Sequence, residues 1–127
     1  ILVYANDASS PDKQARALEL VSEALRSRKG CVSTQVLQEF FVVATRKTKV
    51  PAAIARGQIL ALRALDIVQI DPDLIVAAID LHVVHGLSFW DALIVKSAAA
   101  AGCRRLYSED LQSGRSLDGV RILNPFA

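Results

Sequence analysis

Residues 88–110 read SFWDALIVKSAAAAGCRRLYSED, and this stretch decides the fold class of the chain. Ser88 is a favoured N-cap residue, and the apolar, alanine-rich run to Ala101 predicts a helix that is ended by Gly102. The run 104–108 then predicts a short strand, and two acids follow it at once. A helix that leads directly into a strand is typical of α/β folds, so the same alternation is expected elsewhere in the chain.

The rest of the sequence shows that alternation. Pro11, Pro51 and Pro72 each open an apolar-periodic segment, and proline is favoured in the first turn of a helix. We predict helices over 12–28, 35–47, 51–65, 72–86 and 88–101, strands over 1–5, 30–33, 66–70, 104–108 and 120–123, and a polar loop over 108–119. This order favours a single α/β domain over residues 1–127, a three-layer α/β/α sandwich with a mostly parallel central sheet.

Composition excludes several other classes of protein. The chain has 127 residues, of which 52% are hydrophobic and 22% charged, so it resembles a folded domain and not a disordered or collagenous polymer. The longest apolar run, 74–79, is too short for a membrane span, and no signal-peptide pattern opens the chain. Cys31 and Cys103 lie far apart, which argues against a disulfide framework and a zinc knuckle and favours a cytoplasmic address.

Charge and motifs narrow the chemistry. The formal net charge is +2, which permits contact with nucleic acid without demonstrating it. The chain has no glycine-rich phosphate-binding motif and no G-x-S-x-G elbow for a serine nucleophile. Acids dominate the positions just after the predicted strands, where ligands bind in open α/β sheets. Carboxylate chemistry with a hard divalent cation is therefore the favoured class.

Glu39 and Asp91 are the first two candidate metal ligands. Glu39 borders valines on its predicted helix and has no basic residue three or four positions later, although an acid at the edge of a helix that reaches water fits the same pattern. Asp91 stands third after Ser88, which is close to a capping box and makes a structural role at least as good an explanation. Both roles are compatible, because a helix N-terminus at the carboxyl edge of a sheet points its acid toward a ligand.

The third candidate is Asp110, which follows the strand 104–108 directly. Glu109 is a weaker neighbour, and Ser108 could orient the carboxylates or a water molecule through its hydroxyl group, but all three also fit an exposed turn with a serine cap. Asp7 follows the predicted first strand and is a peripheral candidate, since a turn with Asn6 explains it equally well.

Other polar residues have simpler explanations. His82 and His85 are spaced as metal ligands can be, yet His85 next to Gly86 is explained as a residue of a helix C-terminus. Lys96 and the basic cluster 46–49 could contact phosphates, although solvated helix ends are the commoner cause of such cations. The two cysteines flank predicted strands and fit buried apolar residues.

Taken in order, four stretches resemble the PIN-domain family, and within it the small VapC-type toxin ribonucleases. They are the opening ILVYAND, the segment STQVLQEFF with Glu39, the segment LSFWDALI with Asp91, and LYSEDLQSG with Asp110, and the tail RILNPF adds to the likeness. The family's invariant aspartate, in an Asp-Thr-Asn-like stretch, would fall three residues before Ile1. We therefore expect the natural chain to have further residues ahead of Ile1.

The resemblance implies hydrolysis of RNA phosphodiester bonds that depends on Mg²⁺ or Mn²⁺, with Glu39, Asp91 and Asp110 as catalytic and metal-binding residues. It also implies a homodimer and a cognate antitoxin protein that blocks the site. Two other functions stay open at this point: a PIN-like module that binds RNA or protein without cleavage, and a receiver-like or phosphatase-like domain with an acidic Mg²⁺ pocket. The last is the weakest, because Lys96 lies in mid-helix and not at a strand end.

Overall fold

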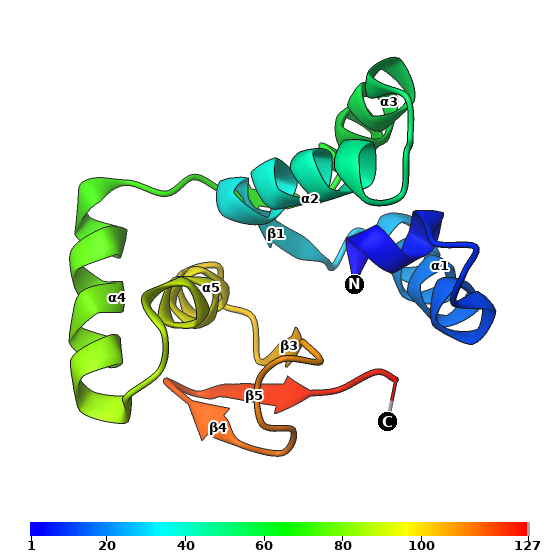
Figure 1. Cartoon of the computed structure of the whole chain (residues 1–127). Coiled ribbons are helices and arrows are strands. Elements are labelled where there is room, and N and C mark those ends of the chain that lie inside the picture. The colour runs from blue at the N-terminus through cyan, green and yellow to red at the C-terminus, as the bar shows by residue number, and fades with distance from the viewer. Residues whose placement is uncertain (127) are drawn as a thin grey trace. The chain divides into compact units, whose positions relative to one another are not determined.

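The computed structural model describes residues 1–126 of the chain. Helices and short strands alternate along it, as Figure 1 shows. The helices are η1 (Leu2–Asn6, a 3-10 helix), α1 (Pro11–Ser27), α2 (Thr34–Arg46), α3 (Ala52–Leu62), α4 (Pro72–His85) and α5 (Phe89–Ala100). The strands are β1 (Cys31–Ser33), β2 (Asp66–Val68), β3 (Arg105–Tyr107), β4 (Ser116–Leu117) and β5 (Val120–Leu123). All the predicted α-helices are confirmed, as are the predicted strands other than the first.

Local signals set the ends of these helices. The carboxylate of Asp71 accepts a hydrogen bond from the backbone N–H of Leu74 and caps the start of α4, with Pro72 as its first residue. Gly86 ends α4 in the left-handed conformation, at φ 68°, which glycine adopts without a steric penalty. Ser88 then caps α5 through its hydroxyl oxygen. Three residues thus separate two helices that pack against each other.

The predicted first strand over residues 1–5 is wrong. This segment forms η1, in which the N–H of Tyr4 donates to the carbonyl of Ile1 at 3.1 Å and the N–H of Asp7 donates to the carbonyl of Tyr4 at 3.0 Å. A strand needs a neighbouring strand to bond its backbone groups, whereas η1 bonds these groups within its own turns and packs on α1. Five apolar residues in a row have no period that would separate the two structures.

The strands lie in two small sheets. β1 and β2 form a two-stranded sheet, and the other strands form a three-stranded sheet in the order β3-β5-β4. β3 and β5 are parallel, whereas β4 and β5 are antiparallel. The α/β alternation is present, but a central sheet is not found among residues 1–126, so the predicted three-layer sandwich is not observed there. Because residues 1–5 are helical, the strand that was expected to extend the sheet is missing.

The predicted loop over 108–119 contains a strand that the sequence analysis missed. β4 pairs with β5 through Leu117 and Val120, and only Asp118 and Gly119 separate them. Both connecting residues have positive φ, at 52° and 76°, as a tight hairpin turn requires. The dipeptide Asp-Gly was the available signal, because it is among the strongest indications of such a turn.

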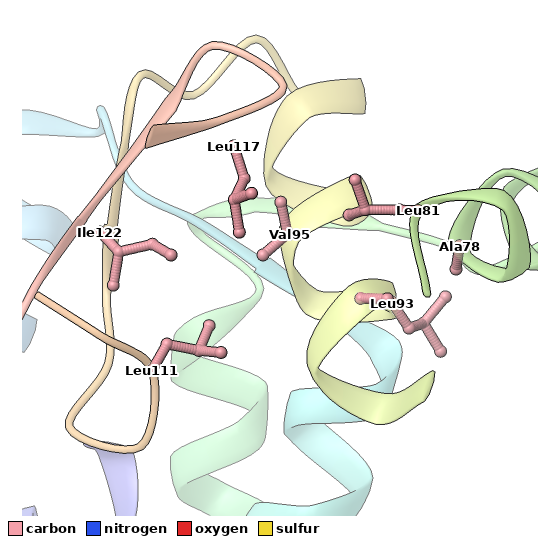
Figure 2. Packing of buried hydrophobic residues seen from close by; sticks show 8 residues of the cluster. Ala78, Leu81, Leu93, Val95, Leu111, Leu117 and Ile122 are labelled. Carbon is pink, nitrogen blue, oxygen red and sulfur yellow. The ribbon is translucent and has the colours of Figure 1, made fainter. Parts of the chain in front are cut away.

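The described chain divides into two compact units. Unit 1 comprises residues 1–32, 36–67 and Phe126, and unit 2 comprises residues 33–35 and 68–125. The core of unit 2 joins α4 and α5 to the three-stranded sheet, and Figure 2 shows its side chains. Its buried members are Ala78, Leu81, Ala92, Leu93, Val95, Leu111, Leu117 and Ile122. Each large side chain among them stabilises the fold by about 1.5–3 kcal/mol through burial.

Unit 1 has a core of smaller side chains. Its buried hydrophobic residues are Ala17, Phe40, Ala44, Ala55, Leu62 and Leu65. Alanine at these positions lets helices approach closely, so little space is left for added atoms. Outside this core, the side-chain amides of Asn6 and Gln58 exchange two hydrogen bonds of 2.9 Å and tie η1 to α3.

Two further expectations are tested by the structure. Neither cysteine is free, because Cys31 and Cys103 are both disulfide-bonded. The expectation of two buried apolar residues is therefore wrong, and so is the argument from their spacing against disulfide bonding. The cytoplasmic address loses the support that was taken from the cysteines, because disulfides are rare in that compartment. No single helix among residues 1–126 has the length and apolar composition to cross a membrane; α4 and α5 meet that test only as a pair bent by 118°.

Candidate functional site

Asp91 lies in the first turn of α5, in unit 2. Its backbone N–H donates to the hydroxyl oxygen of Ser88 at 3.1 Å, so the predicted helix cap is confirmed. A complete capping box would also use the carboxylate, which would accept from the backbone N–H of Ser88. Among residues 1–126 the half-buried carboxylate of Asp91 has neither a hydrogen-bond nor an ion-pair partner. The cap therefore explains the backbone of Asp91 and leaves its charged group unused.

Asp110 is held in a turn directly after β3. The hydroxyl oxygen of Ser108 accepts hydrogen bonds from the N–H groups of Asp110 at 3.2 Å and Leu111 at 3.4 Å. The N–H of Ser108 in turn donates to the carbonyl of Leu123 at 3.0 Å, and Leu111 is buried in the core. Ser108 is thus the turn cap that the sequence allowed. The carboxylate of Asp110 is exposed, with no partner within the described part of the chain.

The remaining predicted acids lie elsewhere. Glu109 is half-buried beside Asp110 in unit 2. Glu39 is exposed on α2 and belongs to unit 1. Asp7, also in unit 1, ends η1. Within unit 2 the structure therefore joins Ser108 directly to Asp110, while Glu39 and Asp7 are described as parts of the other unit.

The carboxylate of Asp7 has its own hydrogen bonds. It accepts from the hydroxyl group of Ser9 and, at 3.1 Å, from the backbone N–H of Ser9. The hydroxyl bond is the largest cause that lowers the pKa of Asp7 below its ordinary value, and the backbone bond and the charge of Lys47 act in the same direction. A carboxylate engaged in this way is a turn-forming group, which agrees with the peripheral rank of Asp7 in the sequence analysis.

The carboxylates of Asp91 and Asp110 fit a hard divalent cation in donor type, because Mg²⁺ and Mn²⁺ prefer oxygen ligands. Neither group is engaged by another side chain of residues 1–126, so both remain open to a ligand. Three or more histidine, cysteine, aspartate or glutamate side chains do not come together in a metal-binding group anywhere in this described range. Asp91 and Asp110 thus match the cation in the chemistry of their donor atoms.

The sheet of unit 2 has a cationic face that was not predicted from the sequence. Arg105 of β3 and Arg121 of β5 are register partners in a parallel pair, so their exposed side chains lie on the same face of the sheet. Tyr107 follows two residues after Arg105, on that face, and is 37% exposed. We call Arg105, Tyr107 and Arg121 the β3–β5 face. Its opposite side carries Leu106 and Ile122, which pack into the core.

Two minor candidates have structural partners. The side chain of Lys96 forms an ion pair with Asp118, the turn residue between β4 and β5. The ring of His82 is hydrogen-bonded through Nδ1 to the carbonyl of Leu87, just beyond the end of α4. These contacts give Lys96 and His82 structural roles.

The family of the chain was identified by comparison with protein-family models. Residues 1–114 match the family described as PIN domain, which is most of the chain. Members of this family have an α/β fold and are generally hydrolytic nucleases that typically use divalent metal ions. A search of curated proteins found none that matches the chain.

Proposed function

Because the chain belongs to the PIN domain family, we propose that it is a metal-dependent endoribonuclease of the VapC type, the toxin of a toxin–antitoxin pair. The family supplies the general activity, hydrolysis by a nuclease, and the finer assignment rests on the residues of this chain. Its proposed catalytic and metal-binding residues are Glu39, Asp91 and Asp110, with Ser108, Glu109 and Asp7 in supporting positions.

The state of Asp91 is the observation that carries this proposal. A half-buried carboxylate without a partner costs free energy, because burial removes water from a charged group. The cap at Ser88 needs only the backbone N–H of residue 91, so it does not require an acid there. A bound cation would offset that cost. Cation binding therefore explains why residue 91 is an acid, which the helix cap alone does not explain.

The ligands come from three segments of the chain. Asp91 begins α5 and Asp110 follows β3, and both offer an unengaged carboxylate. Glu39 enters the proposal through its place in the segment STQVLQEFF and the family match alone. When bound, Mg²⁺ or Mn²⁺ activates a water molecule for in-line attack and neutralises charge on the leaving oxygen. Ser108 holds the turn that carries Asp110, which limits the positions its carboxylate can take.

The β3–β5 face suits the RNA substrate. Two exposed arginines on neighbouring strands can contact successive phosphates, and the exposed ring of Tyr107 can stack on a base. Contacts of this kind have little sequence preference and favour single-stranded RNA. β3 leads directly into the turn that carries Asp110. An RNA strand bound on the β3–β5 face would therefore pass close to Asp110, a proposed metal-binding residue.

The same proposal includes the wider setting of a toxin. The protein would act in the cytoplasm as a homodimer, and a cognate antitoxin protein would block the acids until it is removed. Size-exclusion chromatography with light scattering tests the dimer, and growth arrest after induced expression tests the toxin role.

Cleavage of mixed single-stranded RNA by the protein with its complete natural N-terminus is the direct test. We expect cleavage with Mg²⁺ or Mn²⁺, none with a chelator, and a loss of at least about a hundredfold in Asp91→Asn. Asparagine keeps the N–H that bonds to Ser88, so the variant should retain the fold. Asp73→Asn is the matched control, because it removes the same charge from the first turn of α4.

A binding module without cleavage is the second candidate function. It is favoured by the lack of a three-residue metal group among residues 1–126. Tight RNA binding without cleavage under any metal condition, with Asp91→Asn folding and binding like the parent, would replace the nuclease proposal with this one. If Asp73→Asn and Asp91→Asn lose cleavage equally, the cause is a loss of helix stability. That result would also contradict the proposed metal-binding role of Asp91.

A further inference from the structure

Trp90, in the first turn of α5, is the most exposed aromatic residue among residues 1–126. It is 60% exposed, although its indole ring is among the largest apolar groups that a side chain offers. The helix cap uses Ser88 and the N–H of Asp91, and other side chains of α5 form its buried face. Neither capping nor core packing therefore explains a tryptophan at this position.

The indole ring of Trp90 is supported from one side. The ring of Phe89 meets it edge to face, with ring centroids 5.2 Å apart and an interplanar angle of 71°. Phe89 in turn packs against the buried core of unit 2. Within residues 1–126 the indole of Trp90 has no other ring contact and no hydrogen bond. The ring is thus held by the core and stays open to a flat ligand.

The place of Trp90 in the sequence points to the kind of ligand. It directly precedes Asp91, and Tyr107 of the β3–β5 face stands three residues before Asp110. All four residues belong to unit 2, and the carboxylates of both acids are unengaged within the described part of the chain. In a nucleotide one sugar joins the base to its phosphate. A nucleotide with its phosphate at these acids therefore brings its base close to an exposed aromatic ring.

From these observations we propose that Trp90 stacks on an unpaired base of the RNA substrate. This inference rests on the proposed nuclease function and names a residue that selects the substrate class. A base inside a duplex is covered on both faces by its neighbours, so it has to leave the helix before it can stack on an indole ring. Trp90 therefore favours single-stranded segments, and it accepts all four bases because each has an aromatic face.

A protein partner fits Trp90 less well than RNA does. Protein docking surfaces are contiguous apolar patches, whereas the other large apolar side chains of α5 are buried or half-buried. The next residue, Asp91, has a charged carboxylate, and a protein surface over both residues would remove the water that remains around it. A single base covers the indole ring and leaves that carboxylate accessible.

The fluorescence of Trp90 tests the proposal, because Trp90 is the only tryptophan of the chain. The full chain is titrated in chelator, which prevents metal-dependent cleavage, with three labelled probes: a single-stranded RNA of about 12 nucleotides, its duplex, and an abasic ribose-phosphate oligomer of equal length. The abasic oligomer has the phosphates of the RNA but no bases to stack. We expect the single strand to quench the emission of Trp90 in step with its binding, measured by anisotropy. The other two probes should bind without quenching.

Variants of Trp90 separate stacking from charge. Trp90→Ala should weaken binding of the single-stranded RNA at least about fivefold and leave the affinity for the abasic oligomer unchanged. Trp90→Phe keeps an aromatic face and should restore most of the lost affinity. Val83→Ala is the matched control, because Val83 is a 73% exposed apolar residue of the same unit. Thermal melting of all three variants at the parent temperature excludes unfolding as the cause of any loss.

Several results would overturn the proposal. Trp90 emission that stays unchanged as RNA binds is one, and equal RNA affinity of Trp90→Ala and the parent is another, even where the parent cleaves RNA. Absence of saturable RNA binding, or equal quenching by the duplex, would also refute it. A dimer that dissociates in Trp90→Ala, with RNA affinity unchanged, would assign Trp90 to a protein interface. Quenching by the single strand without cleavage under any metal condition would support the stacking and refute the nuclease.

Discussion

Gly30 occupies a position where any side chain would collide with its surroundings. A Cβ atom there would lie 2.8 Å from the Cβ of Ala24 and 3.1 Å from Cδ2 of Leu65. Leu65 can adjust its side chain, but the methyl group of Ala24 is fixed to the backbone of α1 and cannot turn away. The glycine is therefore required by close packing between the end of α1 and the start of β1.

We predict that Gly30→Ala lowers the free energy of unfolding by about 1–3 kcal/mol, as an overpacked core does. Gly57→Ala is the matched control, because Gly57 is an exposed residue inside α3 with nothing within 4 Å of an added Cβ. Alanine there should raise stability by about 0.5–1 kcal/mol through helix propensity. Urea unfolding of the two variants measures both effects, and an unchanged midpoint for Gly30→Ala would contradict the packing argument.

Asp7 makes stability depend on pH. Its folded-state pKa lies below its unfolded value, first because of the Ser9 hydroxyl group, so it stabilises the fold above the unfolded pKa. That contribution disappears as the pH falls through the folded pKa. Ser9→Ala should raise the pKa of Asp7 toward 3.8. When the pH falls below about 4, the free energy of unfolding should then decrease less in this variant than in the parent.

The pKa of Asp7 can be followed by NMR titration of its carboxyl carbon. Ser22→Ala, which changes an exposed serine of α1, should leave that pKa unchanged. A pKa of Asp7 that is the same in Ser9→Ala and in the parent would show that the hydroxyl bond does not set it.

At the scale of elements, local chemistry predicted most of the fold. The helix starts at Pro11, Pro72 and Ser88 and the stop at Gly86 depend on backbone groups within one turn, so the sequence contains the whole cause. Strands depend on a partner that is distant in sequence. This is why residues 1–5 were predicted wrongly, and why the pairing of the strands into two small sheets was not foreseen.

The candidate site likewise has features with local causes and features that depend on residues distant in sequence. The cap at Ser88 and the turn at Ser108 are local, and both were predicted. The β3–β5 face was not, because it depends on the register that sets Arg105 beside Arg121 across separate strands. Alternation within β3 alone would have placed Arg105 and Tyr107 on one side, but a single strand does not show which side is exposed.

At the scale of the whole molecule, the net charge is small. Fifteen lysines and arginines against thirteen acids give a net charge of only +2, so a long-range field contributes little to RNA binding. Affinity for RNA should then come from local contacts, chiefly at the β3–β5 face. Each phosphate contact releases counterions, so the number of such contacts sets how steeply the RNA affinity falls as the salt concentration rises.

We predict that Arg121→Ala lowers the slope of log affinity against log salt by about 0.7, the value for one phosphate contact on single-stranded RNA. Tyr107→Ala should weaken binding by about 1–3 kcal/mol without changing that slope, because stacking releases no counterions. Fluorescence anisotropy in chelator measures both without cleavage, and Lys29→Ala serves as the control for loss of one exposed cation elsewhere. If Lys29→Ala and Arg121→Ala reduce the slope equally, binding is a property of net charge, and the β3–β5 face has no special part in it.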